Sequence, residues 1–147
     1  MTVALRADIA APASSRQAPA ATLAVVAMNF AMFGVTLAQG ADAGAFLDRF
    51  GLVPRELLGG WGAAGEAWLS PVTAMFLHGG WLHLAGNVFY LWIFGPSLEA
   101  RLGARRFAAF YFGCGLVAAA IHVASDPSGF VPTVGASGAV AGLLGAY

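Results

Sequence analysis

Long stretches without a charged residue alternate with short polar segments along this chain. Residues 22–41, 71–98 and 107–125 contain no Asp, Glu, Lys or Arg. About 20 apolar residues are enough to cross a bilayer as a helix. We therefore predict membrane-spanning helices at 22–41 and 107–125, and at least one more within 71–98.

The stretch 71–98 is longer than one span needs and is interrupted by the dipeptide Gly79-Gly80. Paired glycines favour a break in a helix. We expect a span from Trp81 to Leu98, preceded by a re-entrant or interfacial segment at 71–78. A further apolar helix is expected to begin at Ser137.

The segments between the spans differ in character. Residues 1–21 are rich in Ala, Pro and Ser and are typical of a disordered tail. Residues 42–70 mix charges with apolar patches and with Trp61 and Trp68. This pattern predicts short helices at the membrane interface, with the two tryptophans as anchors. Residues 99–106 and 126–134 are predicted to be polar loops.

The arginines orient the chain, because cytoplasmic loops carry an excess of basic residues. Arg101, Arg105 and Arg106 fall in the loop 99–106. We expect this loop and the N-terminal tail to be cytoplasmic, and 42–70 and 126–134 to face outside. Ser137 then enters the membrane from the outer side.

Composition supports membrane residence. Charged residues make up 10% of the 147 residues and hydrophobic residues 59%, whereas soluble domains carry about 25% charged residues. The fold class expected is an all-α, polytopic membrane protein. A net charge of zero without a basic cluster makes nucleic acid an unexpected partner, and the single cysteine, Cys114, excludes an internal disulfide and a cysteine-based metal site.

Three polar residues form a candidate site. His83 and Asn87 are four residues apart and share one face of a helix. Ser137 starts a later helix from the same side of the membrane, between Gly135 and Gly138. Helix N-terminal amides together with His and Asn donors are typical of an oxyanion hole, which makes acyl transfer by a serine nucleophile the chemical hypothesis.

Simpler interpretations of the same residues stay open. A serine at a helix start is most often an N-cap, and His83 with Asn87 can be polar groups that hold helices together. His122 is interpreted as a satisfied core group rather than a base. Glu99 and Arg101 can be a solvated loop pair.

Three motifs together resemble the rhomboid family of intramembrane serine proteases. They are FLHGGWLHLAGNVFYLWIFG at 76–95, LEARLG at 98–103 and VGASGAVAGLLGAY at 134–147. The resemblance covers residues 22–147, which would form a rhomboid-like transmembrane domain, with 1–21 as a cytoplasmic tail. It implies a multi-pass protein of the bacterial inner membrane that cleaves transmembrane protein substrates without a metal or cofactor.

The resemblance also implies a role for each matching residue. Ser137 would be the nucleophile, and His83, Asn87 and the Ser137 amide would stabilise the oxyanion. The supporting residues would be His78, lining a water-containing cavity; Gly135 and Gly138, flanking the serine; and Glu99 and Arg101, bracing the adjacent loop.

The family's general base is a histidine on a later helix, and no histidine follows Ser137 in this sequence. We therefore expect about 3.5 of six transmembrane helices, a fragment truncated in the fourth, and no activity from these residues alone. Two alternatives remain at this point: a non-catalytic rhomboid-like protein that binds transmembrane segments, and an unrelated small structural or transport protein of the membrane.

Overall fold

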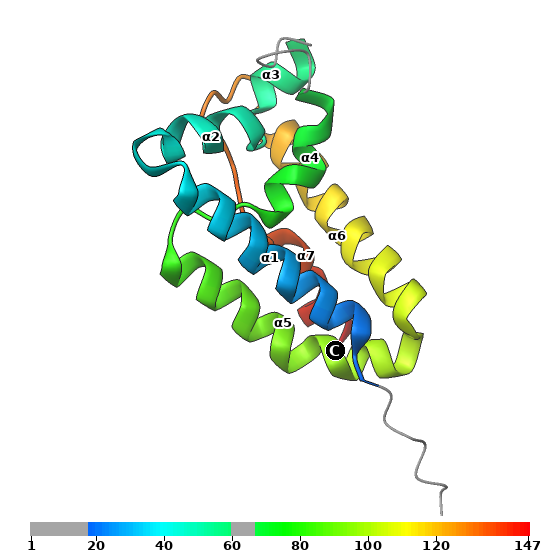
Figure 1. Ribbon diagram of the computed structural model, residues 1–147. Helices are drawn as coiled ribbons and strands as arrows, with labels where there is room; N and C mark the ends of the chain where they lie inside the picture. The colour runs from blue at the N-terminus through cyan, green and yellow to red at the C-terminus, as the bar shows by residue number, and fades with distance from the viewer. Residues whose placement is uncertain (1–17, 60–66) are drawn as a thin grey trace, which may run out of the picture.

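The computed structural model describes residues 18–59 and 67–147 as a bundle of helices (Figure 1), with no strand among them. In chain order these are α1 (Ala20–Ala38), η1 (Gly40–Asp42), α2 (Ala43–Phe50), α3 (Pro54–Gly59), η2 (Ala67–Leu69), α4 (Ser70–Thr73), η3 (Ala74–Phe76), α5 (Trp81–Leu102), α6 (Ala104–Ser125) and α7 (Ser137–Ala146). The all-α prediction is confirmed.

The predicted spans correspond to the long helices α1, α5 and α6. Within the described ranges, α1 and α6 have the length and apolar composition needed to cross a membrane. Helix α5 is as long as α6, at 22 residues, and it carries Glu99 and Arg101 in its last turns. The shorter α7 packs against both α5 and α6.

The polar loop predicted at 99–106 is wrong. Helix α5 continues to Leu102 and α6 begins at Ala104, so Gly103 alone joins them. Gly103 has a φ of +78°, a conformation that glycine adopts without steric cost. The charged residues of 99–106 were interpreted as a loop, but they belong to the end of α5 and the start of α6.

We define residues 42–76 as the outer segment; its described parts, 42–59 and 67–76, contain the short helices that were predicted for 42–70. Helices α2, α3 and α4 gather at one end of the bundle, opposite the α5–α6 junction (Figure 1). Trp68 is exposed, while Trp61 lies outside the described residues, as does most of the predicted tail. The break at Gly79-Gly80 is confirmed, since η3 ends at Phe76 and α5 starts at Trp81.

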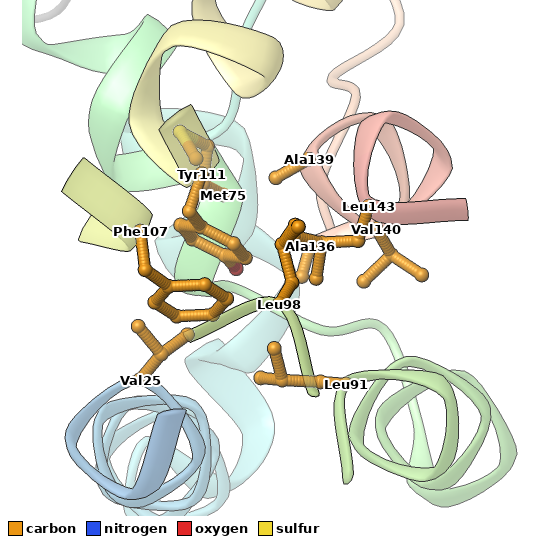
Figure 2. Packing of buried hydrophobic residues seen from close by; sticks show 10 residues of the cluster. All are labelled: Val25, Met75, Leu91, Leu98, Phe107, Tyr111, Ala136, Ala139, Val140 and Leu143. Atoms are coloured by element: carbon orange, nitrogen blue, oxygen red, sulfur yellow. The ribbon is translucent and has the colours of Figure 1, made fainter. Parts of the chain in front are cut away.

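The core lies where α1, α5, α6 and α7 face one another (Figure 2). Its buried side chains are Val25, Met75, Leu91, Leu98, Phe107, Tyr111, Ala136, Ala139, Val140 and Leu143. Four of the ten come from α7 and the residue before it, so the serine-bearing helix is central to the bundle.

Two glycines let α7 approach α6 closely. A Cβ on Gly138 would lie 2.5 Å from the Cβ of Ala118, and one on Gly142 would overlap Cys114 Sγ. Small residues spaced in this way permit tight helix pairs in membranes. The close approach at Gly138 and Gly142 fixes the position of the start of α7 against α6.

Candidate active site

Ser137 is the first residue of α7 but does not cap it. The N-cap position belongs to Ala136, and no side chain makes a capping hydrogen bond there. The Ser137 side chain is exposed, and among the described residues its hydroxyl has no hydrogen-bond partner. The N-cap interpretation is therefore wrong, and this hydroxyl is available at a helix end whose first N–H groups have no intrahelical partners.

The segment leading into Ser137 is tied to the outer segment by backbone hydrogen bonds. Leu52 and Thr133 form an antiparallel bridge, in which each amide donates to the other's carbonyl at 2.9 Å. The Arg55 amide donates to the Gly129 carbonyl at 3.0 Å. These bonds give residues 129–133 a defined path although they belong to no helix.

Gly135 is the point where the segment turns into α7. Its φ is +118°, and its amide donates to the Ala74 carbonyl at 2.8 Å. A Cβ built on Gly135 would overlap the His83 Nε2 atom and lie 3.6 Å from Asn87 Nδ2. Both the backbone conformation and the close neighbours therefore require glycine here.

The predicted pair His83 and Asn87 thus lies against the backbone two residues before Ser137. Asn87 is buried on α5, and its Nδ2 donates to the His83 carbonyl at 3.1 Å, one turn back. His83 is exposed. The two polar side chains of α5 thus lie together at the glycine turn that precedes α7.

His78 supports this arrangement from the connection before α5. Its side chain is fully buried, and its Nδ1 donates to the Phe76 carbonyl at 3.2 Å. Its ring meets the His83 ring edge-on, with centroids 5.1 Å apart. Burial lowers the pKa of His78 to about 4, and the neighbouring His83 acts in the same direction. His78 is therefore neutral at physiological pH.

A cavity of about 200 Å³ opens beside the serine, between the outer segment, α6 and α7. The residues that line it include Gly135, Ser137, His122 and Thr133. His122 is half-buried, and its Nε2 is 2.8 Å from the Thr133 hydroxyl. His122 has a hydrogen-bond partner, as the sequence interpretation expected, but it lies half-buried at a cavity rather than in the core.

Glu99 and Arg101 do not form the expected loop pair. Glu99 is buried and accepts hydrogen bonds from the Ala21 amide at 2.9 Å and from the Thr22 amide and hydroxyl at 2.8 and 2.7 Å. It thereby caps the N-terminus of α1, where a carboxylate is stabilised by free N–H groups and the helix dipole. Arg101 is exposed. Glu99 braces a helix start rather than a loop, at the end of α5 remote from Ser137.

The described residues contain no group of three or more His, Cys, Asp or Glu side chains placed to hold a metal ion.

Comparison with known proteins identifies relatives of one family. The family model described as the Rhomboid domain matches residues 65–147. The chain is 38% identical over 86 residues to the rhomboid protein YdcA of Bacillus subtilis (strain 168), covering 58% of this chain and 43% of that protein. It is 38% identical over 100 residues to RHOMBOID-like protein 5 of Arabidopsis thaliana, covering 68% of this chain and 31% of the relative.

A third relative is Rhomboid protease GluP of Bacillus subtilis (strain 168), 33% identical over 129 residues, which are 87% of this chain and 24% of that protein. The chain thus spans less than half the length of these curated relatives. No solved structure matches it.

Proposed function

Because this chain belongs to the rhomboid family, we propose that Ser137 is the nucleophile of an intramembrane serine endopeptidase. The proposed substrates are membrane-anchored proteins, cut near the end of a transmembrane helix. The family and the apolar helices make this an integral membrane protein, and family membership excludes the unrelated structural or transport protein considered from the sequence.

One observation carries the proposal: an exposed serine hydroxyl that caps nothing lies at the start of α7, directly after a glycine turn packed on His83 and Asn87. A serine held at a helix start only for stability would use its hydroxyl as a cap. Here the hydroxyl remains free for reaction, while nearby groups are hydrogen-bond donors.

The proposed reaction is acyl transfer. Ser137 Oγ attacks the carbonyl carbon of the scissile peptide and loses its proton to a general base. His83 Nε2, Asn87 Nδ2 and the Ser137 amide donate to the developing oxyanion. The leaving amine then takes the proton, and water hydrolyses the acyl-enzyme to release the second product and free the serine.

The general base is proposed to be a histidine outside residues 1–147. Among the described residues no histidine hydrogen-bonds Ser137: His78 bonds the Phe76 carbonyl and His122 bonds Thr133. General-base assistance contributes about 10²–10⁴-fold, and triad residues act as a unit. Residues 1–147 expressed alone are therefore expected to show no peptide hydrolysis above background.

The experiment uses the full-length protein reconstituted in liposomes with a fluorogenic transmembrane peptide. Ser137→Ala is expected to abolish cleavage, and a fluorophosphonate probe is expected to label the wild type but not the variant. Ser128→Ala, an exposed serine of the preceding loop, is the matched control and retains both signals. Labelling and cleavage that persist in Ser137→Ala would refute the proposed nucleophile.

A second candidate is a rhomboid-like protein that binds transmembrane segments without cutting them. The absence of a base bonded to Ser137 within the described residues favours it. It predicts that the full-length protein binds the same peptide in liposomes with unchanged affinity in Ser137→Ala and yields no cleaved product. Turnover by the wild type excludes this candidate.

A further inference from the structure

Thr133 joins three parts of the molecule. Its backbone pairs with Leu52 of the outer segment through two hydrogen bonds of 2.9 Å. Its side-chain hydroxyl lies 2.8 Å from His122 Nε2, near the end of α6. Two residues later along the chain, the Gly135 amide bonds the Ala74 carbonyl. A single threonine is therefore bonded to a helix end and to the outer segment, just before the serine.

This arrangement fixes the register in which the segment around Thr133 pairs with Leu52. In a paired extended segment, a slip by one residue turns every side chain to the opposite face. The Leu52–Thr133 bridge is isolated, so backbone pairing alone specifies the register weakly. The bond from His122 adds a side-chain contact that only residue 133 in its present position can make.

We propose that His122 and Thr133 are positioning residues, whose hydrogen bond holds residues 129–135 so that Gly135 and Ser137 face His83 and Asn87. This inference rests on the proposed function and adds to it the groups that keep the nucleophile in place. Neither residue touches the reacting atoms; both act through the backbone that leads into α7.

The bond does not require one protonation state of the imidazole. The threonine hydroxyl can donate to a neutral Nε2 or accept from a protonated one. A general base would instead need its lone pair directed at Ser137, and Nε2 is already committed to Thr133.

The test is a double-mutant cycle in the full-length protein, reconstituted in liposomes with the fluorogenic transmembrane peptide. His122→Leu and Thr133→Val each remove one partner, and each is expected to lower kcat about fivefold, the factor that one neutral hydrogen bond is worth, with KM unchanged. The double variant is expected to be no worse than either single variant, because both remove the same bond. His122→Gln, which can still bond the hydroxyl, is expected to restore most of kcat, and Ser128→Ala serves as the control with unaltered kcat.

Amide hydrogen exchange gives a readout that needs no activity. The amides of Leu52, Thr133 and Gly135 are expected to exchange faster in His122→Leu and to return towards the wild-type rate in His122→Gln. Unaltered exchange and kcat in His122→Leu would overturn the proposal. So would a fall of His122→Gln to the level of Ser137→Ala, which would make His122 the base. If the wild type neither cleaves nor labels at Ser137, the proposed function fails, and the exchange rates alone then confirm or refute the positioning role.

Discussion

At the residue scale, the backbone conformation and the close neighbours of Gly135 leave room for no other residue type, whereas Ser137, two residues later, is exposed. Its φ of +118° is disfavoured for any residue with a Cβ, and that atom would overlap His83 Nε2. The positions of the proposed oxyanion donors and of the serine segment are therefore defined against the same glycine.

Gly135→Ala is expected to lower the rate of Ser137 labelling by at least about tenfold, because the backbone strain of about 1–3 kcal/mol and the displaced imidazole both disturb the site. The measurement is the rate of fluorophosphonate labelling of the full-length protein. Gly145→Ala, on the same α7 helix and with nothing within 4 Å of the added methyl, is the control. Equal rates in the two variants would show that Gly135 tolerates a side chain.

Sequence patterns predicted the polar residues of the site better than the contacts that hold them. Helix periodicity alone put His83 and Asn87 on one face, and they do lie together against Gly135. The contact between His122 and Thr133 could not be predicted, because it depends on the path of an irregular segment. The roles of all these residues stay proposals that the experiments above address.

At the element scale, Glu99 links two helices that are far apart in sequence. Its carboxylate accepts hydrogen bonds from two backbone amides in the first turn of α1. Gly95, one turn earlier on α5, lies so close to Thr22 that an added Cβ would be 2.7 Å from the Thr22 Cγ2 atom. In the sequence, Glu99 lies near several arginines, and this pattern is typical of a solvated loop. The structure shows instead that Glu99 is buried against the start of α1. No local sequence pattern indicated that the start of α1 would be its partner.

Glu99→Gln is expected to destabilise the protein by about 1.5–3 kcal/mol, the contribution of hydrogen bonds to a charged group. The side-chain amide nitrogen of glutamine would also replace one of the two carboxylate oxygens, and it cannot accept the hydrogen bond that this oxygen accepts. The measurement is the denaturation midpoint in detergent at neutral pH. Arg101→Gln, an exposed position in the same part of α5, is the control and is expected to change the midpoint little. A midpoint for Glu99→Gln that matches this control would contradict the cap.

At the scale of the whole molecule, the two ends of the helix bundle differ in what they expose. The α5–α6 junction carries Arg101, Arg105 and Arg106, all exposed, whereas the short helices α2 and α3 lie at the opposite end of the bundle (Figure 1). From the positive-inside rule we propose that these arginines face the cytoplasm. The bacterial inner membrane and a cytoplasmic N-terminus are proposals on this basis.

Cysteine labelling tests the orientation. In a Cys114→Ala background, Ser128→Cys is expected to react with a membrane-impermeant maleimide added to intact spheroplasts, and Arg105→Cys only after permeabilisation. Both positions are exposed, so access depends on the side of the membrane. The reverse pattern would place Ser137 at the cytoplasmic surface.

The one-residue connection at Gly103 constrains how the protein is made. Helices α5 and α6 each have 22 residues, about 33 Å at 1.5 Å per residue, close to the roughly 30 Å hydrocarbon core. The single linking residue keeps the end of α5 and the start of α6 at the same membrane surface, so the two helices cross the bilayer in opposite directions. The two are expected to insert as one helical hairpin during biogenesis, before α7 begins to pack between them.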